Sequence, residues 1–203
     1  MKVGVLASGE GSNLQAILDR VHGRDGVEVV AVGSDKPAAR ALERARAAGV
    51  PARAFPAGAE GDRRARDLAM ADWLEEAGTE LVVLAGYMQL LDHAFLARFP
   101  QRVVNVHPAL LPAFPGIGSV EQAIAYGVKV VGVTVHFVDE GVDTGPIIAQ
   151  RAIELAGAAT ADEVRAALRP VEHDLLAGVV RLIARGAVTI DPADPRHVLV
   201  GPE

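Results

Sequence analysis

The stretch Lys2-Val3-Gly4-Val5-Leu6-Ala7-Ser8-Gly9-Glu10-Gly11-Ser12-Asn13 begins the chain with an apolar run and continues into a loop that contains two glycines. The apolar run over residues 2–7 predicts a buried strand. Apolar side chains then recur at Leu14, Ile17 and Leu18, which is the spacing of one helix face. A strand, a tight loop and a helix in this order predict an α/β fold.

The glycine loop also predicts a phosphate site. Backbone N–H groups at a helix N-terminus, together with the helix dipole, favour an anion. Gly9 and Gly11 permit a tight turn, Ser12 and Asn13 add polar side chains, and Ser12 with Gln15 fits a capping box. The loop lacks the third glycine of a dinucleotide fingerprint and the Gly-Lys-Ser/Thr of a nucleoside-triphosphate loop. A plain strand-to-helix turn is the alternative.

Apolar patterns of both periods continue along the chain. They predict strands over residues 27–32, 81–85, 128–138 and 147–155, and helices over residues 38–48, 62–77, 92–98, 120–126 and 160–186. We expect an α/β fold with an open, mostly parallel twisted sheet of Rossmann-like type and an antiparallel addition near Ile147. No repeat or linker divides the chain, so we expect a single domain over residues 1–203, with halves of approximately 1–100 and 101–203.

The last predicted helix has a recognisable start and an interruption. Thr160 and Glu163 fit a second capping box. Pro170 should kink or split the helix, because proline removes a backbone donor and clashes with the preceding turn. From Thr189 onward the chain predicts a strand fragment followed by a loose end.

The composition excludes several classes of protein. The chain has 203 residues, no cysteine and a formal net charge of −6 at pH 7. The lack of cysteine excludes disulfides, thiolate catalysis and sulfur-ligated metals, and the acidic balance disfavours a general nucleic-acid binder. No apolar run approaches the ~20 residues of a membrane helix, and the first residues do not resemble a signal peptide. We therefore expect a soluble, cytoplasmic protein.

The segment Val103-Val104-Asn105-Val106-His107-Pro108 carries the candidate catalytic side chains. It predicts a buried strand that leaves the sheet near its proline. Asn105 and His107 are two residues apart, so their side chains leave the strand on the same face. An amide beside an imidazole suits a reaction in which an oxyanion develops while a proton moves, as in acyl transfer. The alternative is that both side chains merely satisfy backbone groups of the loop.

Asp143 is the candidate acid, in a tight loop that follows the strand predicted over residues 128–138. A carboxylate beside His107 would orient the imidazole ring and favour its charged form. An aspartate in a glycine-bounded loop is also a common turn former, and this alternative stays open.

Two other groups of residues suggest ligand contacts. The segment Gly86-Tyr87-Met88-Gln89-Leu90-Leu91 follows the most apolar strand, where an open α/β sheet binds ligands, so it predicts an apolar wall or, alternatively, packing beneath the next helix. A cluster of arginines lies at a helix start and consists of Arg63, Arg64 and Arg66. It is interpreted either as a solvated face or as the binding site of an anionic ligand. Asp35 is interpreted as a solvated loop residue.

Four motifs in this order resemble the glycinamide ribonucleotide formyltransferases of purine biosynthesis, and the resemblance covers nearly the whole chain. They are Gly9-x-Gly11-Ser12-Asn13, Ala85-Gly86-Tyr87-Met88, Asn105-Val106-His107-Pro108-x-Leu110-Leu111-Pro112 and His136-Phe137-Val138-x-x-x-x-Asp143-x-Gly145-Pro146. The resemblance implies transfer of the formyl group of 10-formyltetrahydrofolate, a co-substrate, to the amine of glycinamide ribonucleotide through a tetrahedral intermediate.

The resemblance implies a catalytic role for each of three residues. Asn105 would hydrogen-bond the developing oxyanion. His107, kept protonated by Asp143, would act as general acid and help to move the proton of the attacking amine. No metal is implied, and neither is a nucleic-acid or membrane partner. The enzyme would be a monomer or a homodimer.

The resemblance also implies the substrate contacts. Contacts to the ribonucleotide would come from Gly11, Ser12, Asn13 and Glu172. Contacts to the folate would come from Arg63, Met88, Gln89, Leu90, Leu91 and Asn105. The first half of the chain is expected to be mainly the nucleotide-binding half and the second half the catalytic and folate-binding half. Arg63 and residues 88–91 would reach the folate from the first half, and Glu172 would reach the ribonucleotide from the second.

Three residues depart from the family pattern. Gln89 stands where relatives often carry arginine, Gly118 stands where they often carry histidine, and Pro170 lies just before Glu172. The outer contacts at these positions therefore stay open.

Three other functions share some of these features. Formyltetrahydrofolate deformylase uses water in place of the amine but adds a preceding regulatory domain. Methionyl-tRNA formyltransferase adds a C-terminal barrel for RNA, and we expect neither extension here. A non-catalytic nucleotide-binding module would keep the glycine loop without needing Asn105, His107 and Asp143.

Overall fold

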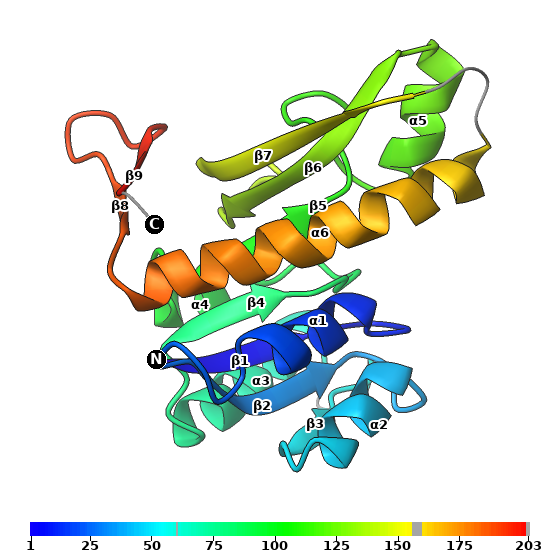
Figure 1. Ribbon diagram of the computed structural model, residues 1–203. Coiled ribbons are helices and arrows are strands. Elements are labelled where there is room, and N and C mark those ends of the chain that lie inside the picture. Colours follow the sequence, from blue (N-terminus) through cyan, green and yellow to red (C-terminus); the bar gives the residue numbers. More distant parts are fainter. Residues whose placement is uncertain (60, 156–159, 202–203) are drawn as a thin grey trace. The chain divides into compact units, whose positions relative to one another are not determined.

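The computed structural model describes residues 1–59, 61–155 and 160–201. The chain forms two compact units, Met1–Asn105 and Val106–Glu203 (Figure 1). The prediction of a single domain stays a prediction. None of the helices in the described ranges combines the length and the apolar character of a membrane span.

The first unit alternates strands with helices. Its strands are β1 (Lys2–Leu6), β2 (Glu28–Ser34), β3 (Ala52–Ala54), β4 (Leu81–Leu84) and the start of β5 (Val103–His107). Its helices are α1 (Ser12–Arg20), α2 (Arg40–Ala47), α3 (Arg63–Glu76) and α4 (His93–Arg98). The strand order is β3-β2-β1-β4-β5, and every neighbouring pair is parallel. All four residues of β4 are buried, as expected for a strand with helices on both faces of the sheet.

The second unit contains the antiparallel strands. Its elements are α5 (Ser119–Tyr126), β6 (Val130–Phe137), β7 (Ile147–Glu154), α6 (Ala161–Ala184), β8 (Val188–Ile190) and β9 (Val198–Val200). β6 pairs with β7 in antiparallel register, and α6 packs against both strands and against α5. The prediction of a mostly parallel sheet with an antiparallel addition is confirmed.

Three local predictions have different outcomes. The prediction of a capping box at Ser12 is wrong. The N-cap residue of α1 is Gly11, which has a φ of 73°, and no side chain caps this helix. The capping box of Thr160 and Glu163 is confirmed. Pro170 does not split the last helix, since α6 continues through it as one element.

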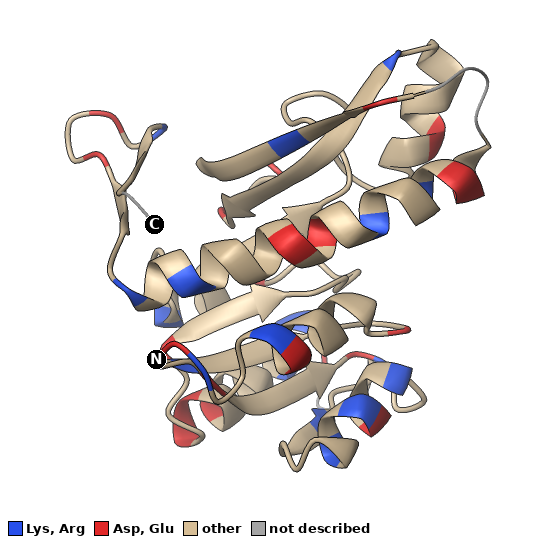
Figure 2. Ribbon diagram, in the orientation of Figure 1, with Lys and Arg blue, Asp and Glu red and all other residues tan. Residues whose placement is uncertain are grey.

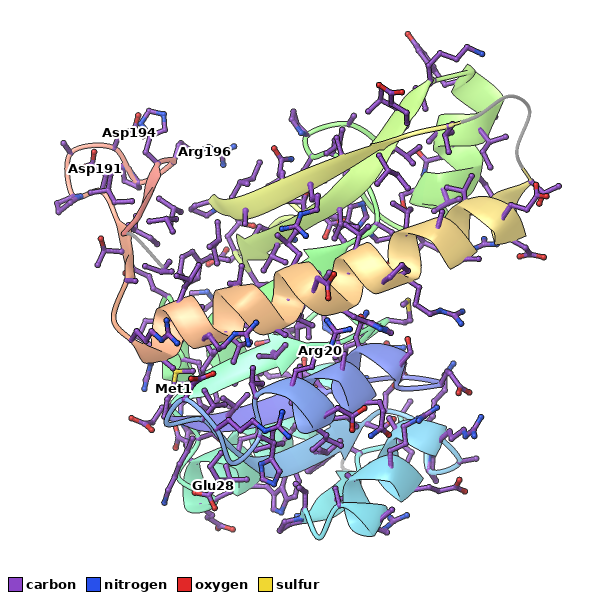
Figure 3. The ribbon with its side chains drawn as sticks, in the orientation of Figure 1. Met1, Arg20, Glu28, Asp191, Asp194 and Arg196 are labelled. Carbon is purple, nitrogen blue, oxygen red and sulfur yellow. The ribbon has the colours of Figure 1, made fainter. Side chains whose placement is uncertain are left out.

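The tail is more ordered than a strand fragment followed by a loose end. β8 and β9 form an antiparallel hairpin, and Figure 3 labels Asp191, Asp194 and Arg196 in the turn between them. Asp191 accepts a hydrogen bond from the N–H of Ala193, and Asp194 accepts one from that of Arg196. Short aspartate side chains that bond the backbone two residues on are typical turn formers, so the polar turn explains the hairpin.

The loop between β6 and β7 depends on Gly145. A Cβ at this position would overlap the carbonyl oxygen of Phe137. We expect Gly145→Ala to lower the free energy of unfolding by about 1–3 kcal/mol, the usual cost of overpacking. The measurement is urea denaturation of the native protein and the variant.

Gly178 offers a matched control within α6. Nothing lies within 4 Å of a Cβ built at this position. Gly178→Ala should therefore leave stability unchanged or raise it by up to about 1 kcal/mol. Equal stabilities of the two alanine variants would contradict the steric account of Gly145.

Candidate active site

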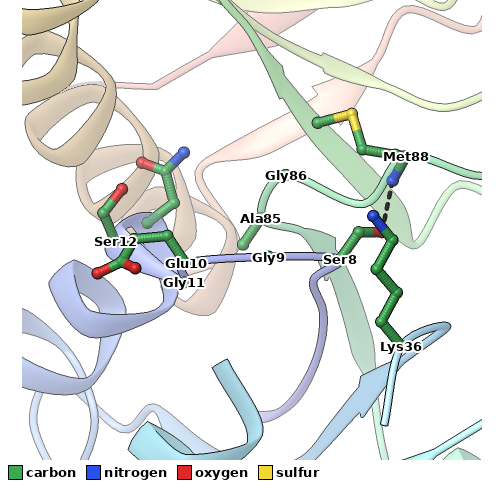
Figure 4. A pocket seen from close by; sticks show the side chains of 10 residues that line it. Ser8, Gly9, Glu10, Gly11, Ser12, Lys36, Ala85, Gly86 and Met88 are labelled. Carbon is green, nitrogen blue, oxygen red and sulfur yellow. Dashed lines mark hydrogen bonds between the residues drawn. The ribbon is translucent and has the colours of Figure 1, made fainter. Parts of the chain in front are cut away.

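The glycine loop connects the ends of neighbouring parallel strands. The N–H of Ala7 donates to the carbonyl of Gly33 near the end of β2, and the N–H of Ser8 donates to that of Gly86 after β4, both at 3.0 Å. The hydroxyl of Ser8 accepts a hydrogen bond of 2.8 Å from the N–H of Met88 (Figure 4). The loop is thereby fixed at the carboxyl edge of the sheet, where open α/β sheets bind ligands.

A cavity of about 280 Å³ opens beside this loop (Figure 4). It is lined by Ser8, Gly9, Glu10, Gly11, Ser12, Asn13, Lys36, Ala85, Gly86 and Met88. The first residues of α1 and the residue Lys36 both belong to the lining. Backbone N–H groups, a helix N-terminus and a nearby cation suit a phosphate or another anion.

Asp143 connects two histidines in the second unit. Its Oδ2 lies 3.3 Å from Nδ1 of His107 on β5, and its Oδ1 lies 3.5 Å from Nε2 of His136 on β6. The N–H of Gly116 also donates to Oδ2 at 2.7 Å. Since an ionised carboxylate only accepts hydrogen bonds, Asp143 accepts the one that it shares with His136.

The other ring nitrogens of the two histidines also face oxygen atoms. Nε2 of His107 lies 2.9 Å from the carbonyl oxygen of Phe114, and Nδ1 of His136 lies 2.7 Å from that of Phe137. Both rings are buried, so their orientation is fixed by these contacts and by packing.

Burial and hydrogen bonding act in opposite directions on the pKa of Asp143. Burial would raise this pKa, but hydrogen bonds from His136 and Gly116 and the charges of His107 and His136 lower it below its ordinary value. Asp143 has a φ of 54°, a left-handed conformation that is uncommon outside glycine. The loop thus holds an ionised carboxylate in a conformation maintained by its neighbours.

Asn105 is the third predicted catalytic residue. It is half-buried on β5, two residues before His107, and alternation along a strand directs both side chains to the same face. The sequence prediction for this strand is therefore matched by its structure.

The segment after β4 presents apolar side chains to solvent. Met88 is 58% exposed and Leu90 is 55% exposed, while Leu91 is half-buried. Gln89 instead turns to Asp35, donating from Nε2 to Oδ2 at 3.0 Å. Exposed apolar residues beside a cavity are typical of a surface that a flat ligand covers.

The predicted arginine cluster separates into two environments. Arg63 is exposed and lies 3.8 Å from the carboxylate of Asp92, at the end of the segment that carries Met88. Arg66 is buried, contrary to the solvated interpretation, and donates from Nε and Nη2 to Oδ1 of Asp67. The other oxygen of Asp67 accepts from the N–H of Asp92, so this pair fixes the start of α4.

The interpretation of Asp35 as a solvated residue is wrong. Its side chain is buried, and Gln89 is one of its partners. Asp35 directly follows the buried strand β2, so it lies at the edge of the sheet. The segment after β4 brings the polar side chain of Gln89 to the same edge. The sequence interpretation did not account for the packing of the segment after β4 over this edge.

The sequence of this chain is similar to those of known proteins. The chain matches the formyl transferase family over residues 1–180.

The chain belongs to the formyl transferase family.

Members of this family with a purine-biosynthesis name are close relatives. Phosphoribosylglycinamide formyltransferase of Bacillus subtilis is 41% identical over 181 residues, which cover 89% of this chain and 93% of that protein. The trifunctional purine biosynthetic protein adenosine-3 of Bos taurus is 38% identical over 190 residues, which cover 93% of this chain and 19% of that protein. The chain is therefore a formyl transferase of purine biosynthesis, and the predicted resemblance is confirmed.

Solved structures of the family share the fold. The crystal structure of glycinamide ribonucleotide transformylase 1 from Symbiobacterium toebii is 45% identical in sequence, with a TM-score of 0.95 over 100% of this chain and 94% of that chain. The predicted fold class is confirmed at the level of the family as well.

In this formyl transferase, the structure brings together some of the predicted site residues. Gly11, Ser12 and Asn13 line one cavity with Met88, and His107 contacts Asp143. Glu172 lies half-buried on α6. The roles assigned to all of these residues stay predictions.

Sequence reasoning missed His136 as a partner of Asp143 and Lys36 as part of the cavity lining. A sequence signal for His136 did exist, because it is a polar residue that alternates with apolar residues along β6 and is buried there. No sequence signal indicated Lys36, since the sequence around a single lysine in a loop does not reveal which cavity the residue lines.

The lowered pKa of Asp143 predicts a pH effect on stability. A carboxyl group whose pKa is lowered by folding stabilises the native state above its unfolded pKa of ~3.9, and this contribution is lost as the pH falls through the folded value. We expect Asp143→Asn to lose less stability than the native protein between about pH 5 and pH 3. Urea denaturation at several pH values measures this difference.

Asparagine tolerates the left-handed backbone conformation of residue 143, so the substitution changes charge more than backbone geometry. The same loss of stability in both proteins over this pH range would contradict the hydrogen-bonded carboxylate described above.

Proposed function

We propose that this enzyme transfers the formyl group of 10-formyltetrahydrofolate to the amine of glycinamide ribonucleotide. The observation that carries the proposal is the contact between the buried imidazole of His107 and the carboxylate of Asp143, two residues beyond Asn105 on the same strand. The family membership supports the reaction class, and the names of the relatives support the substrate. One-carbon metabolism and a cytoplasmic location follow from the same proposal.

In the proposed reaction, the amine nitrogen attacks the formyl carbon and forms a new C–N bond. The formyl oxygen becomes an oxyanion, to which the amide of Asn105 donates a hydrogen bond. One well-placed donor of this kind is typically worth ~3 kcal/mol of barrier. The oxyanion then re-forms the carbonyl as the bond from the formyl carbon to N10 of the folate breaks.

Two protons change place in this reaction, one leaving the attacking amine and one reaching N10 of the departing tetrahydrofolate. His107 can give a proton to the leaving nitrogen and take one from the amine, directly or through water. Asp143 would hold the ring in position and stabilise its charged form. His136 contacts the other carboxylate oxygen and would hold Asp143 in turn.

The remaining predicted contacts follow from the surfaces already described. The cavity beside Gly11, Ser12 and Asn13 would hold the phosphate of the ribonucleotide. The exposed side chains of Met88 and Leu90 would cover the flat pterin ring, and Arg63 would lie near the folate acid. Glu172 would contact the ribonucleotide.

The direct test follows the release of tetrahydrofolate from 10-formyltetrahydrofolate with and without glycinamide ribonucleotide. We expect release only when the ribonucleotide is present, with one formylated ribonucleotide formed for each tetrahydrofolate. Release without the ribonucleotide would indicate hydrolysis by a deformylase, and no release in either case would contradict an enzymatic role of the folate.

Substitution of the pair tests the residue roles. His107→Asn and Asp143→Asn should each lower kcat by roughly 10²–10⁴-fold, the usual contribution of a general acid–base group, while the KM for the ribonucleotide changes little. Steady-state kinetics with both substrates varied measures this effect.

His197 provides a matched control in the same unit. Its Nδ1 lies 3.3 Å from Oδ2 of Asp194, the same separation as in the His107–Asp143 pair, but its side chain is 72% exposed. His197→Asn should retain native kinetics. Near-native kcat in both His107→Asn and Asp143→Asn would refute the assigned roles.

A further inference from the structure

Arg44 on α2 binds the glycine loop at several points. Its Nε donates to the carbonyl oxygen of Glu10 at 2.8 Å, and its Nη2 donates to the carboxylate of Glu10 at 2.6 Å. Its Nη1 donates to Oε1 of Gln15 on α1 at 3.0 Å. The side chain of Arg44 is 22% exposed, and its guanidinium group connects α2 to both the loop and the helix that follows it.

Three successive carbonyls of the loop accept hydrogen bonds from protein donors. The carbonyl of Gly9 accepts from the N–H of Ala41, that of Glu10 accepts from Arg44, and that of Gly11 accepts from the N–H of Gln15 inside α1.

In a trans peptide, each carbonyl points opposite to the N–H of the next residue. The N–H groups of Glu10, Gly11 and Ser12 are consequently directed away from these partners, and the same three residues line the cavity. Successive N–H groups presented in this way form a concave binding site for an anion.

The loop approaches α2 closely. A Cβ at Gly11 would lie 2.8 Å from both the Cα and the Cβ of Ala41, which is too close for any larger residue. The first turns of α2 therefore serve as a rigid support for the loop. Several basic residues of α2 are visible in Figure 2.

Glu10 introduces a negative charge into this loop. Arg44 and Arg40 both form ion pairs with its carboxylate, at 2.6 Å and 2.9 Å. The hydrogen bond from Arg44 is the largest influence on the pKa of Glu10 and lowers it. Both arginines donate hydrogen bonds to the carboxylate of Glu10. Arg44 also donates to the backbone carbonyl of Glu10, and this contact distinguishes it from Arg40.

We propose that Arg44 is a positioning residue that holds the peptide plane between Glu10 and Gly11, the middle one of the three, in the orientation that binds the phosphate of the substrate. The inference rests on the proposed function, since that function supplies a phosphorylated substrate. Arg44 acts through the loop and touches no reacting atom.

The test compares Arg44→Ala with Arg40→Ala in steady-state kinetics. Arg44→Ala should raise the KM for glycinamide ribonucleotide about tenfold, the loss expected for hydrogen bonds from a charged group, with little change in kcat or in the KM for the formyl donor. Arg40→Ala removes the same charge from the same helix and spares the backbone contact. It should change that KM by less than roughly twofold.

Arg44→Lys separates geometry from charge. Lysine keeps the positive charge but lacks the planar fork that donates in three directions. Its KM for the ribonucleotide should stay well above the native value, and a native KM would overturn the geometric role. This variant also keeps the proposal testable if Arg44→Ala fails to fold.

Binding of inorganic phosphate, measured by isothermal titration calorimetry, tests the loop without the reaction. Arg44→Ala should weaken phosphate binding by a similar factor, and Arg40→Ala should not. Unchanged phosphate binding and an unchanged KM in Arg44→Ala would overturn the proposal. If the native protein shows no ribonucleotide-dependent transfer, the proposed function fails, while the phosphate titration still decides the role of Arg44.

Discussion

The carboxylate of Asp143 is the interaction on which the candidate site depends. It lies beside imidazoles from two different strands and accepts a hydrogen bond from the backbone of a third segment, Gly116. Since each partner comes from a separate part of the second unit, the carboxylate fixes their positions at once. Burial alone would make the charged form costly, and the surrounding donors offset that cost. The backbone of Asp143 has a left-handed conformation. An ionised, fixed carboxylate is what a histidine needs in order to keep one orientation while it gives and takes a proton.

The glycine loop of the first unit is likewise held by several neighbouring segments. It is short, yet its backbone is held by the strand ends on one side and by α2 on the other. Its carbonyls are engaged by protein donors, so that its N–H groups are left for an anion. Strand–loop–helix connections of this type place the positive end of a helix dipole beside the loop. The chemistry of phosphate binding thus follows from backbone geometry more than from any one charged side chain.

The sequence predicts the larger features because they depend on local patterns. Apolar runs of strand length and helical periodicity locate the elements, and the change to strict alternation near Val131 identifies the antiparallel part. Thr160 and Glu163 are close in sequence, so their capping box is predictable.

The failed predictions depend on tertiary contacts. Ser12 does not cap α1, because the backbone of Gly11 packs against α2. Arg66 is buried because the adjacent Asp67, itself buried, pairs with its guanidinium group. Asp35 is buried with a hydrogen bond from Gln89, which is distant in sequence. Pro170 is tolerated within α6, and nothing in the sequence distinguishes this case from a split helix. The His107–Asp143 contact joins residues far apart along the chain, and only the resemblance to a family indicated it before the structure placed them together.

A double-mutant cycle on His107 and Asp143 tests the central claim that the two side chains act as one unit in formyl transfer. Single-turnover rates would be measured for the native enzyme, His107→Asn, Asp143→Asn and the double variant. If the pair acts together, the double variant should transfer the formyl group within about threefold of the slower single variant. Losses that multiply in the double variant would show that the two residues act independently, and would contradict the account.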